Sequence, residues 1–412
     1  MRTTGTLDGV EHDHIGRRVR EIRSWRGMDL ATTAGLAGIS PSALSLMERG
    51  KRPISKRTVL EAIARALRVS PFELTGQPHP PSGEGTAEAR TAMAALADLL
   101  GGWRIGEVPD GPRRPLPEVL AELERFHAAR NGSGSRGAGD YATQVATLSP
   151  LIRDLLAAAA DPGDRRRVLV PLLLAYHVAG STSARLGIPG LPSLAAERMR
   201  EVAAELDDPV WHSVADWGRA HFLSATNRER QYHLAVAVAD RAPAERPETR
   251  GMANLTAALA AAAMARHDVA ESHLAAAAEL AESIEPDVSP WPSGIMQFGR
   301  TNVGIFAVAV GVEVGDGARV AEAASRIRLA SASRGRQASF WVDYGRGLIT
   351  ERRTREKGLR ALLRAEELAP QQVRNNVFAR EAVTALLSTA RGHAGGPDLR
   401  GLAWRMNIAP KG

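Results

Sequence analysis

The apolar residues of the N-terminal segment recur every three or four positions, which is the period of an amphipathic helix. The runs Ile15 to Trp25 and Val59 to Leu67 both follow this spacing. Capping residues and glycines divide the segment into five parts, because they mark where helices begin and end. The sequence predicts helices at about 12–26, 29–36, 40–49 and 56–68, and a short one that starts at Ser70-Pro71.

The second and third of these helices are separated by the turn Gly38-Ile39-Ser40. Ser40 can cap the third helix and Pro41 suits its first turn, so the break between the helices is sharp. Leu44 and Met47 lie three positions apart in the third helix and are expected to face the core. This arrangement predicts a helix-turn-helix, whose second helix enters the major groove of DNA.

From about residue 89 onward the pattern is helical, rich in Ala and Leu and without the alternation of strands. The clearest helix pairs are predicted at 251–284, 299–331 and 340–368, and loops at 104–117 and 131–139. Each pair leaves one apolar face uncovered, so stacked neighbours would bury it in an α-solenoid.

The predicted fold is therefore all-α, with two domains. A five-helix domain spans 12–76, a linker rich in Pro and Gly spans 77–88, and the solenoid spans 89–412.

Positive charge is concentrated in the first domain. The chain of 412 residues carries a formal charge of +7, and the segment from His12 to Gly76 holds 12 Lys or Arg against 6 Asp or Glu. A basic module beside a nearly neutral body is typical of a nucleic-acid-binding protein, because Lys and Arg that bind phosphates release counterions.

The absence of cysteine excludes disulfides, thiolate nucleophiles and cysteine-bound zinc, and it fits a reducing compartment. No stretch approaches the roughly 18 consecutive apolar residues of a membrane span. The N-terminus lacks the apolar core of a signal peptide. We expect a cytoplasmic protein without a membrane partner, which lies on the nucleoid when it is bound to DNA.

Motifs of catalysis and cofactor binding are absent from the sequence. It contains no GxxxxGK[ST], no GxGxxG after a strand, no HExxH and no GxSxG. The 11 histidines are scattered, without the spacing that places two ligands on one helix face. We therefore expect no enzymatic activity, no catalytic residues, no cofactor and no metal.

An ordered set of residues in the first domain points to a known family. The set is Ile15-Gly16-Arg17-Arg18-Val19-Arg20-Glu21-Ile22-Arg23, Gly27, Ala34, Gly38, Ser40, Leu44-Ser45, Glu48-Arg49-Gly50 and Leu67-Arg68-Val69-Ser70-Pro71-Phe72-Glu73-Leu74. With it, the segment resembles the repressor-like helix-turn-helix domain of the XRE/Cro family of bacterial transcriptional regulators. The resemblance implies binding to double-stranded DNA.

The resemblance and the helix geometry together define candidate DNA contacts. The family places base contacts at positions that match Pro41, Ser42 and Leu46, and helical spacing adds Ser45 and Arg49 to the exposed side. The cations around the following loop suit phosphate. The full set is Ser40, Pro41, Ser42, Ser45, Leu46, Arg49, Lys51, Arg52, Lys56 and Arg57.

Few of these side chains can read a base through two hydrogen bonds, so specificity would come from DNA shape, from Arg49, Lys51 and Arg52, or from the N-terminal arm in another groove. The resemblance also implies a structural ion pair between Arg23 and Glu48, which match a pair joining two helices in relatives.

Two further segments, Phe298 to Asp316 and Ala365 to Arg374, resemble tetratricopeptide-like regions of actinobacterial XRE regulators. The resemblance implies a tetratricopeptide-like α-solenoid that dimerises, senses a ligand, or both. Asn302 is the first candidate for ligand binding, and Asn375 and Asn376 are lesser ones. An asparagine bonded to a neighbouring helix or a loop carbonyl is an equally good interpretation.

These features favour a regulator that binds an inverted-repeat operator as a homodimer and responds to a peptide or small-molecule effector. The alternative is a protein-interaction scaffold whose helix-turn-helix docks a protein partner.

Overall fold

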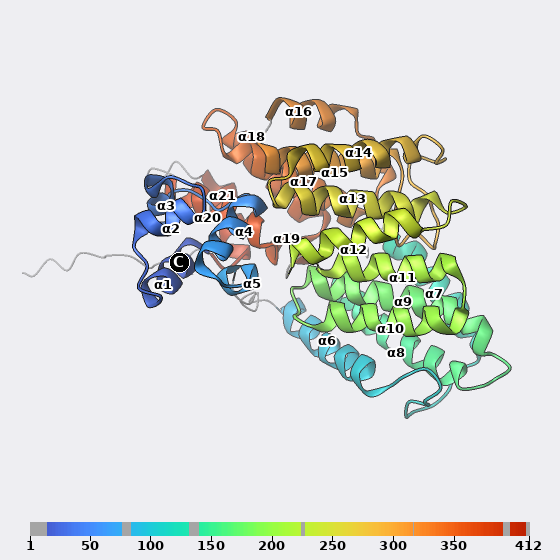
Figure 1. The fold of residues 1–412 in the computed structure, drawn as a ribbon. Helices are drawn as coiled ribbons and strands as arrows, with labels where there is room; N and C mark the ends of the chain where they lie inside the picture. Colours follow the sequence, from blue (N-terminus) through green and yellow to red (C-terminus); the bar gives the residue numbers. More distant parts are fainter. Residues whose placement is uncertain are drawn as a thin grey trace, which may run out of the picture.

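The computed structural model describes residues 15–75, 84–131, 140–223, 227–315, 317–389 and 396–408. All regular structure in these ranges is helical, so the predicted all-α class is confirmed. Figure 1 shows a group of short N-terminal helices beside a much larger helical body.

The N-terminal group follows the sequence prediction closely. Its helices are α1 (Ile15–Trp25), α2 (Leu30–Leu36), α3 (Pro41–Glu48), α4 (Arg57–Leu67) and α5 (Pro71–Thr75). Local capping explains the boundaries, because Asp29 Oδ1 accepts a hydrogen bond from the N–H of Thr32 at 2.7 Å. Ser40 Oγ accepts one from the N–H of Ala43 at 3.2 Å in the same way.

The helices of the body continue the numbering. They are α6 (Glu84–Gly102), α7 (Leu116–Asn131), α8 (Tyr141–Ala159), α9 (Arg165–Arg185), α10 (Leu191–Leu206), α11 (Pro209–Phe222), α12 (Arg228–Arg241), α13 (Pro247–Ala263), α14 (His267–Ala281), α15 (Arg300–Val314), α16 (Gly317–Arg326), α17 (Arg334–Ile349), α18 (Arg355–Leu368), α19 (Pro370–Arg374), α20 (Val377–Thr389) and α21 (Gly396–Arg405), with a short 3-10 turn η3 (Leu329–Ser331).

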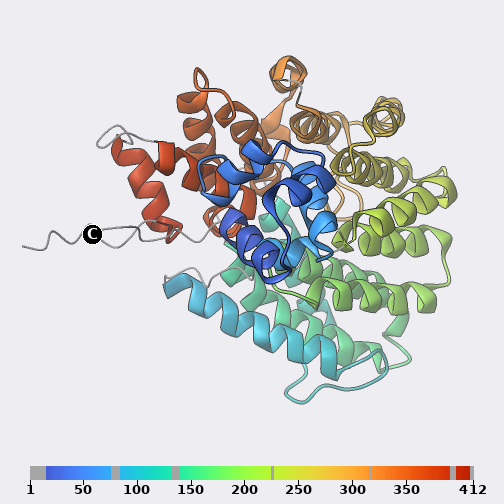
Figure 2. The same cartoon turned by 60° about the vertical axis from the view of Figure 1, so that its left-hand side comes forward.

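Helix pairs form where the sequence indicated them, as α13 with α14, α15 with α16, and α17 with α18. Neighbouring pairs also pack on one another, so the body is a helical solenoid. Figure 2 shows its helices in an arc around the N-terminal group. One apolar core runs through the first half of this arc, from Met93 to Phe306.

Two predicted connections differ from the structure or fall outside it. Helix α6 begins at Glu84, inside the stretch predicted as linker, because the Ala-rich sequence after Gly85 favours helix more than its glycines oppose it. The segment between α6 and α7 is non-helical, as expected for 104–117. The predicted loop at 131–139 lies outside the described residues apart from Asn131, which ends α7.

Within the described residues, no single helix has the length and apolar composition needed to cross a membrane. The bent pair of α2 and α3 passes that test only when its two helices are counted together.

Candidate nucleic-acid interface

The axes of α2 and α3 bend by 107° at the turn between them. This is the angle of a helix-turn-helix, in which one helix supports the other across a short turn. Gly38 makes the turn possible with a φ of +65°, which side chains disfavour. The following amide, that of Ile39, donates to the carbonyl of Ala34 at 3.0 Å and closes the end of α2.

The predicted reading face of α3 is open to solvent in part. Ser40, Pro41, Ser42 and Arg49 are exposed, whereas Leu46 is half-buried. On the opposite side, Leu44 and Met47 are buried in the core of the domain, as their spacing predicts.

Ser45, the remaining candidate for a base contact, is also only partly exposed. Its carbonyl accepts a hydrogen bond from Arg49 Nε at 3.1 Å. Side chains that can reach a base edge are therefore concentrated at the two ends of α3.

The loop after α3 carries cations beside the solenoid. The amides of Lys51 and Arg52 donate to the carbonyl of Leu46 at 2.9 and 3.2 Å, and both side chains are exposed. They border a hollow of about 350 Å³ whose other cations are Lys56 and Arg355 and whose lining includes no acid.

Arg355 begins α18, far along the chain from α3. Sequence analysis missed it, because nothing near residue 355 indicates that the helix-turn-helix lies beside it. The body thus extends the basic surface of the first domain.

Two predicted phosphate contacts, Lys56 and Arg57, are turned toward the body instead. The ammonium group of Lys56 lies against Gly315, the residue that ends α15, so closely that a β-carbon there would collide with it. Arg57 Nη1 donates to Glu313 Oε1 at 2.8 Å, and its Nη2 lies 3.6 Å from Asp343 Oδ1. In this arrangement the Arg57 guanidinium pairs with both carboxylates, so it is not free to bind a DNA phosphate.

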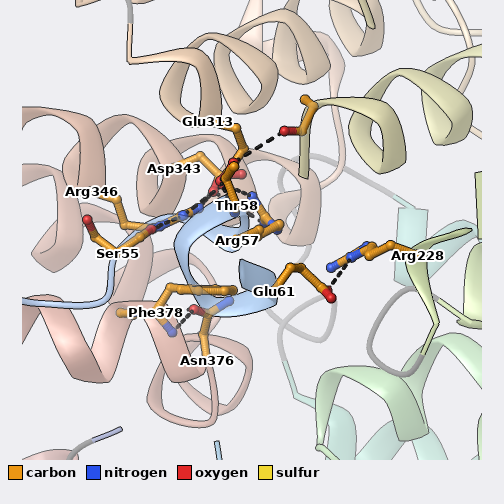
Figure 3. Close-up of polar contacts among 12 residues, drawn as sticks. Ser55, Arg57, Thr58, Glu61, Arg228, Glu313, Asp343, Arg346, Asn376 and Phe378 are labelled. Carbon is orange, nitrogen blue, oxygen red and sulfur yellow. Dashed lines mark hydrogen bonds and ion pairs between the residues drawn. The ribbon is translucent and has the colours of Figure 1, made fainter. Parts of the chain in front are cut away.

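Glu313 also caps α4 from outside its own domain. The residue before that helix, Lys56, makes no side-chain cap, but the N–H of Thr58 donates to Glu313 Oε2 at 3.2 Å. Thr58 Oγ1 donates to the carbonyl of Ala262 at 3.2 Å (Figure 3). A carboxylate at a helix N-terminus satisfies free amides and complements the helix dipole, so Glu313 fixes the position of α4 against α15.

Arg346 completes the arrangement from α17. Its guanidinium bonds to Asp343, donates to Glu313 Oε1 at 3.0 Å, and donates through Nε to the carbonyl of Ser55 at 3.0 Å. The Arg346 side chain is 0% exposed. We call the group of Ser55, Arg57, Thr58, Glu313, Asp343 and Arg346 the docking cluster (Figure 3).

The docking cluster holds two arginines and two carboxylates, so its charges balance. Burial alone would raise the pKa of Glu313, but the charges of Arg346 and Arg57 outweigh it and lower that pKa below its usual value of 4.5. For Arg57, burial works against the charged form, yet Asp343 and Glu313 raise its pKa. Glu313 and Arg57 are therefore both charged at neutral pH.

Apolar and peripheral contacts surround the docking cluster. The ring of Phe378, at the start of α20, packs into the apolar core of the N-terminal group. The Arg346 guanidinium lies 4.4 Å from its centroid and that of Arg57 lies 5.2 Å away. Glu61 on α4 pairs with Arg228 on α12 at 3.3 Å.

Together these contacts hold the domain mainly through α4 and the loop before it. Helix α20 adds two more, because its Glu381 accepts from the N–H of Ile15 at 2.6 Å and its Ser388 Oγ donates to the carbonyl of Gly50 at 2.8 Å. Figure 1 shows α4 and α5 toward the body and α2 and α3 farther from it. The surface that docks is therefore mostly different from the surface predicted to read DNA, and the two meet at Leu46, Lys51 and Arg52, which border the hollow shared with the body.

The predicted pair of Arg23 and Glu48 is present between α1 and α3. Arg23 Nε donates to Glu48 Oε1 at 2.6 Å and its Nη2 donates to Glu48 Oε2 at 2.9 Å, in a two-pronged geometry. Arg23 Nη1 also donates to the carbonyl of Met28 at 2.8 Å. The pair joins α3 to α1, and its side chains are only 15% and 6% exposed.

Replacing Arg23 by Ala should lower the free energy of unfolding by about 3 kcal/mol, because it leaves the Glu48 carboxylate buried without a partner. Chemical denaturation of the full chain measures this. Arg18→Ala is the control, since Arg18 is exposed and its pair with Glu21 contributes about 0.5 kcal/mol or less. Equal losses in both variants would contradict a structural role for the pair.

The three asparagines considered for ligand binding do not come together. Asn302 is 1% exposed, with its Nδ2 3.2 Å from the sulfur of Met252, so it lies in the core between α13 and α15. Asn376 Oδ1 accepts from the amides of Phe378 and Ala379 and caps α20. Asn375 Nδ2 donates to the carbonyl of Gln371 at 2.8 Å. The latter two amides serve local backbone, and none of the three lines the hollow beside α3. A ligand-binding role for the three asparagines stays a prediction.

A search of the described residues for three or more side chains able to hold a metal ion finds no such group.

The bent helix pair, its glycine turn and its exposed second helix define a helix-turn-helix DNA-binding domain attached to a helical solenoid. Residues 14–75 match a family model described as a helix-turn-helix domain. Comparison with curated proteins and with solved structures finds no match for the chain.

Proposed function

We propose that this protein is a sequence-specific, DNA-binding transcriptional regulator of the XRE/Cro type. The observation that carries the proposal is the exposed face of α3, which remains open while the domain docks through α4. Ser42 and Arg49 are the base-contacting candidates on that face, and the exposed Lys51 and Arg52 supply phosphate contacts.

The same proposal includes a homodimer on an inverted-repeat operator. A single α3 of eight residues reaches few bases, and two copies about 34–36 Å apart would read two half-sites one helical turn apart. The solenoid provides the dimer contact and the effector site, and it performs no chemistry. Direct contact between the solenoid and the helix-turn-helix supports an effector site in the solenoid, because a shift of the solenoid helices would move the helix-turn-helix.

The first experiment is a pull-down of genomic fragments with the full chain, followed by sequencing and by gel shifts on the recovered fragments. We expect enrichment of a symmetric motif and an affinity that falls steeply with salt. Recovery of random fragments, together with a shallow dependence on salt, would exclude sequence-specific binding.

Salt dependence also tests the individual phosphate contacts. Lys51→Ala, Arg52→Ala and Arg355→Ala should each weaken binding to all fragments alike and reduce the slope of log K against log salt by about 0.9. Arg360→Ala is the control, because that exposed residue pairs with Glu356 on α18. If Arg355→Ala has no more effect than the control, the basic surface ends at the first domain.

A further inference from the structure

Three arginines from distant parts of the chain meet inside the solenoid. Arg130 of α7 donates through Nη2 to Ser181 Oγ of α9 at 2.8 Å. Arg185 lies one helical turn beyond Ser181, and its guanidinium is so close to Gly335 of α17 that a β-carbon there would collide with it. Arg336 is the next residue. All three side chains are half-buried.

Within the described residues, these arginines have no acidic partner. Arg185 donates to Tyr141 Oη at 2.9 Å and to Gln372 Oε1 at 2.5 Å, both neutral groups. Among the residues that the structure describes, Arg336 has no hydrogen-bond or ion-pair partner, and it faces the ring of Phe306, 5.7 Å away. Three positive charges thus share a confined space without a counterion, whereas the docking cluster balances its charges fully.

The electrostatics agree with this geometry. Burial and, to a smaller extent, the neighbouring charge of Arg185 together lower the pKa of Arg130 to about 10. Burial lowers the pKa of Arg336 to about 9, with Arg185 and Arg130 acting in the same direction. For both, the group that acts in the opposite direction is the hydroxyl of Tyr141 and not a carboxylate. Arg130 and Arg336 stay protonated at neutral pH, and the charge of Arg185 repels both of them.

Hydrogen-bond donors without acceptors surround the arginines. His177 is 2% exposed, His127 is also buried, and neither ring has a hydrogen-bond partner. Burial lowers the pKa of His127 to about 4, so its ring is neutral and presents one N–H. The Trp217 indole N–H, stacked on His177 at 5.2 Å, and the Nε of Arg130 also lack acceptors. Buried donors normally find acceptors, so this set lacks an acceptor-rich partner.

We propose that Arg130, Arg185 and Arg336 form the binding site of a small organic acid that carries a phosphate or carboxylate group. Arginines bind both oxyanions through paired N–H donors, and an oxyanion removes the repulsion among the three.

A cavity of about 400 Å³ is lined by Asn131, which Arg130 contacts, and it indicates what the rest of the ligand is like. His127 and Asn131 of α7 line this cavity, and Asn131 accepts a hydrogen bond from Arg130 at 3.3 Å. The remaining lining includes the hydroxyl and amide groups of Ser289, Ser333 and Gln297, and also Glu124, whose side chain is exposed. The ligand is therefore hydrophilic beyond its acid group.

Helix α17 connects this site to the helix-turn-helix. Arg336 lies in its first turn, and Asp343 and Arg346 of the docking cluster follow seven and ten positions later, about 15 Å along the axis at the far end. An anion that moves Arg336 thus acts on the helix that holds Ser55 and Arg57. This regulatory role rests on the proposed function, whereas binding of the acid does not.

Thermal melting of the full chain tests the site with inorganic phosphate and with citrate, each against sodium chloride at equal ionic strength. We expect phosphate, citrate or both to raise the melting temperature by about 2–5 °C in a saturable way. A response to phosphate alone identifies a phosphate ester as the ligand class, and a response to citrate alone identifies a carboxylic acid.

Arg336→Gln should abolish this shift, and it should raise the melting temperature without added anion because one like charge is removed. Arg336 is the best position because it makes no hydrogen bond that the substitution breaks. Arg360→Gln, on the exposed face of α18, should keep the full shift. If Arg336→Gln does not fold by circular dichroism, Arg130→Gln replaces it.

The anion site is excluded if neither oxyanion exceeds chloride, or if the arginine variant shifts as much as the wild type. Gel shifts with and without the active anion then test the coupling through α17. A melting shift in a protein that binds no DNA would leave the anion site standing and refute the regulator. Specific DNA binding with no melting shift would support the regulator and refute the anion site.

Discussion

Replacing Glu313 by Gln should lower the free energy of unfolding by about 3–5 kcal/mol and detach α4 from the body. Glu313 is buried and serves Arg57, Arg346 and the amide of Thr58 together, so its neutral variant leaves two arginines with Asp343 alone. Urea denaturation measures the loss. Hydrogen exchange of peptides from α4 should also quicken, because the Thr58 amide loses its acceptor.

A matched variant separates this effect from a general loss of charge. Glu322→Gln removes an exposed glutamate on α16 that pairs with Arg326 one turn away, and it should cost less than about 0.5 kcal/mol. The Glu313 carboxylate has a lowered pKa, so its contribution is complete above its usual value of 4.5 and is lost as pH falls below that. Unchanged hydrogen exchange in α4 would contradict its role as the cap of that helix.

Replacing Ser42 by Glu should reduce DNA affinity by about 100-fold or more without changing stability. Ser42 is exposed on the first turn of α3, so the new carboxylate meets solvent in the free protein and phosphates in the complex. Gel shifts on an enriched fragment measure the affinity, and melting of the free protein measures the stability.

Ser272→Glu is the matched control for this substitution. Ser272 is exposed on α14, so the same charge is added far from the proposed interface. An equal loss of affinity in both variants would show that total charge, and not the face of α3, governs binding. Full affinity in Ser42→Glu would move the interface away from α3.

The helix-turn-helix could be predicted almost residue by residue, because its signals are local. Asp29 and Ser40 cap the helices that follow them, and Leu44 and Met47 are buried as their spacing requires. The exposure of Ser42 follows from the same helical period. Such features depend on neighbours within one or two turns, which a single sequence records.

The roles of Lys56 and Arg57 could not be predicted in this way. A cation between α3 and α4 suits a phosphate and a carboxylate equally well, and sequence alone favoured phosphate. The partner of Arg57 is Glu313, 256 residues away, and that separation leaves no trace in local pattern. Large sequence separation is also why the position of Arg355 beside Lys51 could not be predicted. It is likewise why the cluster of Arg130, Arg185 and Arg336 could not be predicted.

The sequence by itself determined the all-α class, the helix-turn-helix with its caps and its core, and the concentration of charge in the first domain. Periodicity and capping fix these, since they act between residues one or two turns apart. Only the tertiary structure decided how charged groups pair. Stacking of the solenoid brings Glu313 to α4 and gives Arg130, Arg185 and Arg336 no acidic partner within the described part of the chain, because pairing of buried charges depends on which helices meet in space.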